Sequence, residues 1–280
     1  AAVEENLAEV PEAPGALYLR PMLLGTDPNI GAADRQPTAR RDILPPISPR
    51  PLTPMSVPTH AALKARQRAL RAGYPQPMAL RVHRAISWIG RAEAERADHD
   101  ARFLFLWIAF NAAYADARRL DAQGRRDASK HERARIDAFF DLVVRLDASG
   151  RIYDAIWARF SGPVRVFLEN PFVFRPFWDH QNGEATGAGW QAAFERDQKR
   201  LAEALANRRT AQILGTLFDR LYVLRNQIVH GGATWNGRVN RDQMRDGAAI
   251  LGFLVPVFVD IMLDNPHEAW GDAFYPVIEG

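Results

Sequence analysis

From Thr59 onward, apolar residues recur at intervals of three and four, the spacing that places them on one face of an α-helix. The period-two alternation of a half-buried strand is nearly absent. The pattern predicts helices over 60–72, 77–96, 100–119, 131–147, 151–169, 190–205, 208–230 and 242–263. A loop is predicted over 171–189. We therefore expect an all-α fold in which residues 78–264 form one helical bundle with additional helices.

The beginning of the chain has a different composition. Residues 1–58 contain 11 of the 19 prolines, most densely in ILPPISPRPLTPMSVP (43–58). Proline lacks the backbone N–H that helices and sheets use, so this segment is predicted to be extended and mobile. We predict two parts, a proline-rich extended arm or linker at 1–58 and an all-α domain at 59–280. The arm would connect a missing upstream domain or wrap around a partner.

Composition excludes several kinds of site. Hydrophobic residues make up 47% and charged residues 25% of the 280 residues, the balance of a globular protein with a sizeable core. The chain has no cysteine, which rules out disulfides and thiolate zinc sites. Its seven histidines include no HxH or HxxxH pair. We expect neither a metal nor another cofactor.

The longest apolar run, AAILGFLVPVFV (248–259), ends at Asp260. It is shorter than the ~20 residues that a membrane-spanning helix needs, and Pro256 would kink it, so a buried core helix is predicted. The first residues, AAVEENLAEV, are acidic and lack the basic-then-apolar order of a signal peptide. We expect a cytoplasmic protein with no membrane partner. The first residue is not Met, which suggests a fragment or a processed form.

The basic residues are unusual in kind, since 33 are Arg and 3 are Lys, within a net charge of +3. The planar guanidinium donates two parallel hydrogen bonds to a phosphate, which suits a nucleic-acid partner. A genome rich in GC codons explains the same bias, because Ala is abundant as well. The Arg content therefore permits an RNA partner without establishing one.

The predicted helix at 208–230 has two stripes. Its bundle-facing stripe consists of Leu214, Leu217, Leu221, Leu224 and Ile228. The neighbouring stripe consists of Phe218, Tyr222, Arg225 and Val229. A charge on such an apolar flank must be paired, face a cleft, or face another subunit. We predict a two-fold homodimer in which this flank meets its own copy.

Arg225, Asn226 and His230 lie in the last turns of that helix, within LRNQIVHGG (224–232). Asn226 and His230 are four apart and share a face, whereas Arg225 and His230 lie about 140° apart on an ideal helix. The last two converge only through the reach of Arg or by unwinding at the following glycines. One interpretation is an ordinary helix end, with His favoured by the dipole and Gly as the cap. The other is a site for acid–base and phosphate chemistry.

A family resemblance favours the second interpretation. LRNQIVHGG resembles the signature of the HEPN superfamily, in which Arg, a polar residue that is frequently Asn, three further residues and His end a helix of an α-bundle. FLFLWIAFNAAY (103–114) resembles the earlier helix of the Apea-like HEPN group. The resemblance covers roughly residues 78–264 and implies a HEPN-like helical bundle.

Many HEPN proteins are metal-independent ribonucleases that act as dimers. The resemblance implies that Arg225, Asn226 and His230 are catalytic, with RNA as substrate and its 2′-hydroxyl as nucleophile. It suggests a toxin or antiviral-defence effector, with an antitoxin or an upstream sensor domain as a possible partner. Two alternatives remain open: a non-catalytic HEPN-like module that binds RNA, a nucleotide or a partner protein, and a structural bundle in which Arg225 and His230 only cap and pair.

Further candidates surround the motif. Asn111 is predicted to be buried, either as an amide that satisfies a neighbouring helix or as a supporting residue that positions the Arg–His pair. The basic segment RLDAQGRRDASKHERAR (119–135) is either a solvated loop and helix face or a contact for the RNA backbone. The candidates for backbone contacts are Arg125, Arg126, Lys130, Arg208 and Arg209.

Overall fold

The structure is a computed structural model that describes residues 57–114, 128–159, 161–238, 240–273 and 275. All of them belong to one compact unit, Ile43–Gly280. Apart from Val57 and Pro58, the predicted arm at 1–58 lies outside the described residues.

Within the described residues the fold is all-α and has no strand, which confirms the predicted class. The ten α-helices are α1 His60–Leu70, α2 Gln76–Ala94, α3 His99–Tyr114, α4 Ala128–Leu146, α5 Arg151–Asp154, α6 Ser161–Leu168, α7 Arg175–Gln181, α8 Trp190–Ala206, α9 Thr210–Val229 and α10 Arg241–Asp264. The helices expected at 77–96, 190–205 and 242–263 differ from α2, α8 and α10 by at most two residues at either end.

The prediction of a loop over 171–189 is wrong. This stretch contains α7 and two 3₁₀ turns, Pro171–Val173 and Ala185–Gly187. Pro171 and Pro176 do not interrupt these elements, because they occupy first-turn positions, where a helix has no use for the missing N–H. The single helix expected at 151–169 is instead α5 and α6, joined by a π-helical turn at Ala155–Arg159.

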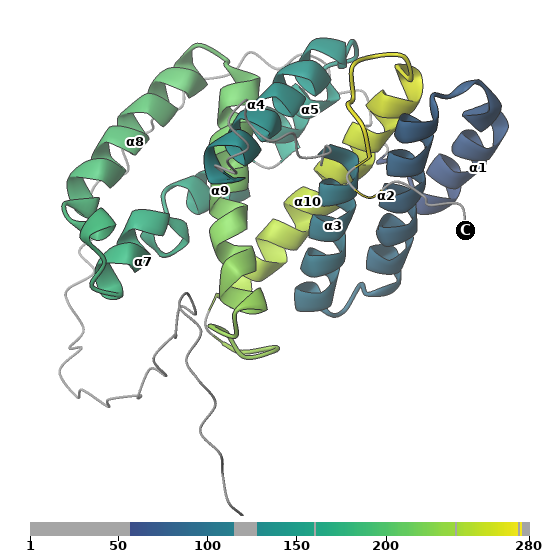
Figure 1. Cartoon of the computed structure of the whole chain (residues 1–280). Coiled ribbons are helices and arrows are strands. Elements are labelled where there is room, and N and C mark those ends of the chain that lie inside the picture. The colour runs from purple at the N-terminus through teal and green to yellow at the C-terminus, as the bar shows by residue number, and fades with distance from the viewer. Residues whose placement is uncertain (1–56, 115–127, 160, 239, 274, 276–280) are drawn as a thin grey trace, which may run out of the picture. The chain divides into compact units, whose positions relative to one another are not determined.

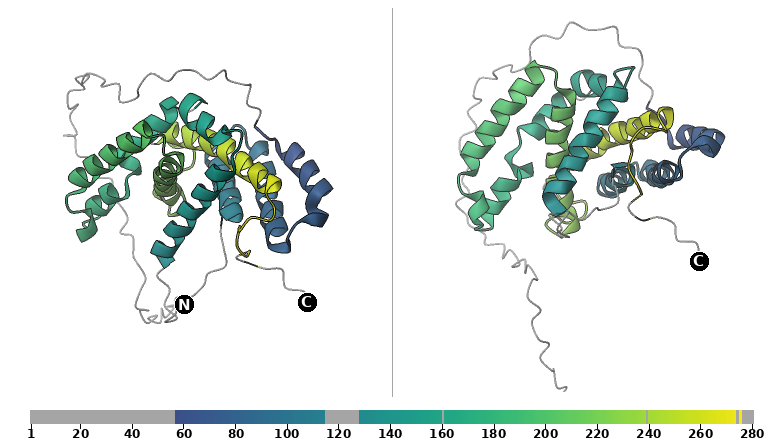
Figure 2. Two further views of the ribbon diagram at one scale, coloured as in Figure 1. Left: turned by 90° about the horizontal axis from the view of Figure 1, so that it is seen from above. Right: turned by 45° about the horizontal axis from the view of Figure 1, so that its top comes forward.

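Helix α10 lies at the centre of the packing (Figure 1). It contacts α3 and α2 most extensively and also touches α1, α4, α5, α6 and α9. Helices α2 and α3 lie side by side in both figures (Figures 1 and 2), and α1 packs against α2. Helix α9 is held between α4 and α8. Each long helix therefore buries a face against at least two others, as a bundle requires.

Helix α10 is long and apolar enough, by length and composition alone, to cross a membrane. However, 78% of its apolar stretch is buried against the rest of the protein. The buried core helix predicted from AAILGFLVPVFV is therefore confirmed, and Pro256 is accommodated inside it.

Four phenylalanines from four helices meet in the core: Phe110 of α3, Phe140 of α4, Phe218 of α9 and Phe258 of α10. The ring centroid of Phe218 lies 4.4 Å from that of Phe110 and 4.8 Å from that of Phe140. Aromatic pairs in this range add to the stabilisation that comes from burying the rings. Helix α9 is thereby fixed at Phe218, two turns before the residues of the predicted site.

Candidate functional site

Arg225 and Asn226 lie together, half-buried, in the penultimate turn of α9. The guanidinium of Arg225 donates from Nη1 to Oδ1 of Asn226 over 2.9 Å. This acceptor is neutral, and no carboxylate in the described part of the chain forms an ion pair with Arg225. Asn226 therefore orients the guanidinium, and no described carboxylate neutralises its positive charge.

His230 is exposed and forms the C-cap of α9. Its backbone N–H donates to the carbonyl of Asn226 over 3.0 Å, and its φ of −94° and ψ of 13° remain near the helical region. The left-handed conformation begins only at Gly231, with φ 72°. The helix thus does not unwind at His230, which stays about 140° around the axis from Arg225.

The imidazole of His230 makes no hydrogen bond or ion pair with any residue that the structure describes. Within one protomer the structure therefore brings Arg225 and Asn226 together and leaves His230 separate, on the face that it shares with Asn226. An exposed side chain with no partner among the described residues can meet a substrate or a second copy of the chain.

The apolar flank beside the motif is buried at one end and open at the other. Phe218 is 3% exposed, whereas Tyr222 is 38% and Val229 is 49% exposed. The predicted stripe is therefore a core contact at its beginning and an uncovered surface near Arg225. This uncovered part is the surface that the homodimer prediction requires.

Gln227, inside the motif, holds the end of α9 in place. Its amide donates from Nε2 to the carbonyl of Phe172 over 2.9 Å, and its Oε1 accepts from Nδ2 of Asn240 over 2.7 Å. It thus connects α9 to the turn before α7 and to the N-cap of α10. The sequence pattern does not indicate this role, because Phe172 is 55 residues away along the chain and Asn240 lies beyond the loop that follows α9.

The loop after His230 is tied to the N-terminus of α3. The indole of Trp235 donates to Asp98 over 2.9 Å, and the backbone N–H of Asn236 donates to Asp100 over 2.8 Å. Arg241 forms an ion pair with Asp100 and donates to the side chain of Asn236 over 3.0 Å. These contacts fix the path of the chain that leaves the motif.

Asp98 also caps α3, since its Oδ1 accepts from the backbone N–H groups of Asp100 and Ala101 at 3.0 Å each. The pKa of Asp98 is lowered chiefly by the Ala101 N–H, against the effect of burial and with help from the Trp235 indole. The group therefore stays ionised at neutral pH and holds the loop through a charge-assisted hydrogen bond.

The two basic candidates that the structure describes, Arg208 and Arg209, lie far from the motif. Arg208 and Arg209 are exposed at the other end of α9, a 20-residue helix and therefore about 30 Å long. The guanidinium of Arg208 lies 6.0 Å from the ring of Tyr153. Arg125 and Arg126 lie outside the described residues, as does the side chain of Lys130 in the first turn of α4. Within one protomer, neither Arg208 nor Arg209 can reach the surroundings of Arg225.

Asn111 is half-buried, so the prediction of a buried amide is wrong. Asn111 lies one turn after Trp107 and one turn before Tyr114, both of which are buried, but its own side chain remains partly exposed. No hydrogen bond joins the Asn111 side chain to another described residue, and nothing in the described contacts connects it to Arg225 or His230.

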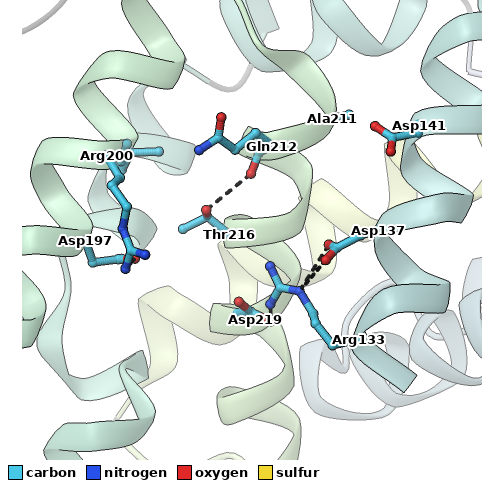
Figure 3. Close-up of a pocket in the computed structure, with 10 residues that line it drawn as sticks. Arg133, Asp137, Asp141, Asp197, Arg200, Ala211, Gln212, Thr216 and Asp219 are labelled. Atoms are coloured by element: carbon cyan, nitrogen blue, oxygen red, sulfur yellow. Dashed lines mark hydrogen bonds and ion pairs between the residues drawn. The ribbon is translucent and has the colours of Figure 1, made fainter. Parts of the chain in front are cut away.

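A polar cavity of about 440 Å³ lies between α4, α8 and α9, and Thr216 of α9 is one of its lining residues (Figure 3). Its charged lining residues are Arg133, Arg200, Asp137, Asp141, Asp197 and Asp219. Arg133 pairs with Asp137 and Asp219, and Arg200 pairs with Asp197. With four carboxylates and two guanidiniums, the lining does not favour a phosphate.

Gly215 of α9 leaves room for the side chains of Arg133 and Asp137 from α4. A Cβ at Gly215 would lie 3.1 Å from Oδ1 of Asp137 and 3.2 Å from Nη2 of Arg133. Among the described residues, no three His, Asp or Glu side chains are arranged to hold a metal ion. The cavity is thus a network of ion pairs between helices and contains none of the predicted site residues.

No family model matches this chain, and searches of curated proteins and of solved structures find no significant match. Function must therefore be argued from the residues of the site.

Proposed function

We propose that this protein is a metal-independent endoribonuclease of the HEPN type, with Arg225, Asn226 and His230 as its site. The observation that carries the proposal is that neither of the two ionisable side chains, Arg225 and His230, forms an ion pair with a described residue. Arg225 is oriented by a neutral amide rather than neutralised by a carboxylate, and the imidazole of His230 is exposed and unpaired among the described residues. A helix end that served only structure would have no need to hold an uncompensated guanidinium on an apolar flank.

The chemistry needs only proton transfer and stabilisation of a phosphate. The RNA 2′-oxygen attacks the adjacent phosphorus, the bond to the 5′-oxygen breaks, and the 5′-oxygen leaves with a proton. Imidazole, with an ordinary pKa of about 6.5, can accept the first proton or donate the second near neutral pH. Arg225 would stabilise the charge that develops on the phosphate oxygens, and Asn226 would keep the guanidinium in position.

A second copy of the chain completes this site. Arg225 and His230 lie on different sides of one helix, so two motifs facing each other across a two-fold axis would place Arg225 of one copy near His230 of the other. The exposed Tyr222 and Val229 supply an apolar contact at that position. An isologous interface of this kind buries the same patch on both copies.

Introducing a charge into this patch should therefore break the dimer. We expect Val229→Arg to shift the protein to the monomer in sedimentation at micromolar concentration and to lower RNA cleavage with it. The matched control is Leu70→Arg on α1, because Leu70 is 45% exposed, close to the 49% of Val229. If Val229→Arg dimerises as the wild type does, or if the wild type is fully active as a monomer, the proposal of a dimeric site is wrong.

The resemblance also suggests a role as a cytoplasmic toxin or antiviral-defence effector, controlled by an antitoxin or an upstream sensor domain. A non-catalytic module that uses the same surface for RNA, a nucleotide or a partner protein is the second candidate. It is favoured by the separation of Arg225 and His230 within one protomer, since binding does not require them to converge.

The test is to incubate the full chain with a single-stranded RNA and with DNA of the same sequence, in the presence of EDTA. We expect the RNA to be cut and the DNA to remain intact, because DNA lacks the 2′-hydroxyl. Cleavage that stops on chelation, or equal cleavage of the DNA, would exclude this mechanism. Retention of RNA without cleavage would support the binding module instead.

A further inference from the structure

A cavity of about 410 Å³ opens between α2, α3 and α10 and shares no residue with the motif of α9. These three helices form the most extensive contacts of the fold (Figure 1). The cavity walls are mainly apolar and include Ile89, Leu106, Phe253 and Pro256. The charged residues of these walls are Arg96, Arg102 and Glu93, so two guanidiniums face one carboxylate and the net charge is positive. Its size falls in the range of ordinary small-molecule sites, roughly 300–1,000 Å³.

Arg102 is placed unfavourably for a cation. Burial lowers the pKa of its guanidinium, and the nearby charge of Arg96 lowers it further, while the charge of Glu93 acts in the opposite direction. Arg102 is also the fourth residue of α3, close to the positive end of the helix dipole. Desolvation, a like charge and the helix dipole therefore all destabilise the charged form of this guanidinium.

The neighbouring carboxylates are engaged elsewhere. Asp98 caps α3 and holds Trp235, and Asp100 is paired with Arg241. Glu93 accepts the backbone N–H of His60 over 2.6 Å. None of the described carboxylates forms an ion pair with Arg102 or Arg96. A half-buried charge without a counter-ion is costly, and an anion in the cavity would offset that cost.

Helix α10 leaves room for the guanidinium at Gly252. A Cβ at this position would lie 2.6 Å from Nη2 of Arg102, which is closer than any real contact. Glycine in a helix interior costs about 1 kcal/mol relative to alanine, so a reason for it is expected. Here the bare backbone allows the guanidinium of Arg102 to lie against α10 at the cavity wall.

We propose that this cavity binds a small molecule with an anionic head and an apolar body. The head, a carboxylate or a phosphate, binds Arg102 and Arg96, and the body packs against Leu106, Phe253 and Pro256. A planar guanidinium suits both heads, because each accepts two parallel hydrogen bonds. The proposal does not rest on the ribonuclease activity, so either can fail without the other.

Calorimetric titration of the full chain tests the proposal with four probes: octanoate, octyl phosphate, inorganic phosphate and the neutral octanamide. We expect saturable binding of octanoate or octyl phosphate, with the tighter of the two identifying the head group. Octanamide and inorganic phosphate should each bind at least about 10-fold more weakly, because each lacks one of the two features.

Arg102→Ala should weaken binding of the preferred probe about 10- to 100-fold, the size of a lost hydrogen bond to a charged group. Gly252→Ala should weaken it too, because the new methyl group displaces the guanidinium while the charge remains. Arg68→Ala, which removes an exposed charge on α1, is the matched control and should bind like the wild type.

Thermal unfolding without ligand separates a binding role from a structural one. Since Arg102 has no carboxylate partner among the described residues, Arg102→Ala should unfold at the same temperature as the wild type or a higher one. A marked loss of thermal stability would show that Arg102 serves the fold, and would overturn the proposal. The proposal would also be overturned if neither octanoate nor octyl phosphate binds the wild type, or if Arg102→Ala binds the preferred probe as tightly as the wild type does.

Discussion

Replacing His230 by alanine should slow RNA cleavage by about 10²- to 10⁴-fold, the usual loss when a general acid–base group is removed. The imidazole is the only group of the motif that can exchange protons near neutral pH, so no neighbour can take its place. Because the side chain is exposed and makes no described hydrogen bond, the variant should fold normally. Single-turnover cleavage rates, with circular dichroism as the check on folding, measure this effect.

The matched control for this experiment is His83→Ala. His83 is likewise exposed and lies on α2, outside the motif. It should cleave RNA at the wild-type rate. If His230→Ala and His83→Ala both cleave like the wild type, His230 has no catalytic role. If neither His230→Ala nor the wild type cleaves while both retain RNA, the site is a binding module.

Arg225→Ala should be similarly damaging, because it removes the charge that stabilises the phosphate in the transition state. Arg225→Lys should recover little of the loss, since an ammonium group cannot reproduce the two parallel hydrogen bonds of the planar guanidinium. Rates of the three proteins, measured at saturating RNA, separate this effect from weaker binding. Recovery of more than half the wild-type rate by Arg225→Lys would mean that Arg225 acts only as a surface charge.

Asn226→Ala should have a smaller effect than either Arg225 variant. The amide accepts one hydrogen bond from the guanidinium at 2.9 Å, and the variant would keep the charge and the half-buried position of Arg225. Loss of one hydrogen bond to a charged group costs about 1.5–3 kcal/mol, roughly 10- to 100-fold in rate, which is at the lower end of the loss expected for Arg225→Ala. If Asn226→Ala were as inactive as Arg225→Ala, the amide itself would contact the reacting phosphate.

The bundle was predictable because most of its helices are amphipathic. In α9, the stripe from Leu214 to Leu224 is buried as its spacing requires. Helix α3 was harder, since it is apolar on nearly all sides and periodicity alone cannot tell which side faces the core. Because of that ambiguity the sequence predicts a buried Asn111, whereas the structure shows it half-buried.

The motif could be located from the sequence, but its surroundings could not. Arg225, Asn226 and His230 are close along one helix, so helical geometry fixes their relation. The contacts that hold the following loop join Trp235 to Asp98, residues 137 positions apart. Such a pairing depends on how α3 and α9 pack, so the local sequence around either residue does not predict it. The sequence likewise does not predict that Arg102 has no carboxylate partner among the described residues, because this depends on how α2, α3 and α10 pack.

One measurement tests the central claim most directly: the chemical ends of the fragments produced from a single RNA by the wild type and by His230→Ala, both in EDTA. Attack by the 2′-oxygen predicts a 2′,3′-cyclic phosphate on one fragment and a 5′-hydroxyl on the other. Mass spectrometry should find this pair of ends with the wild type and almost none with His230→Ala. Fragments with a 3′-hydroxyl and a 5′-phosphate, or equal yields of cyclic phosphate from the two proteins, would contradict the account.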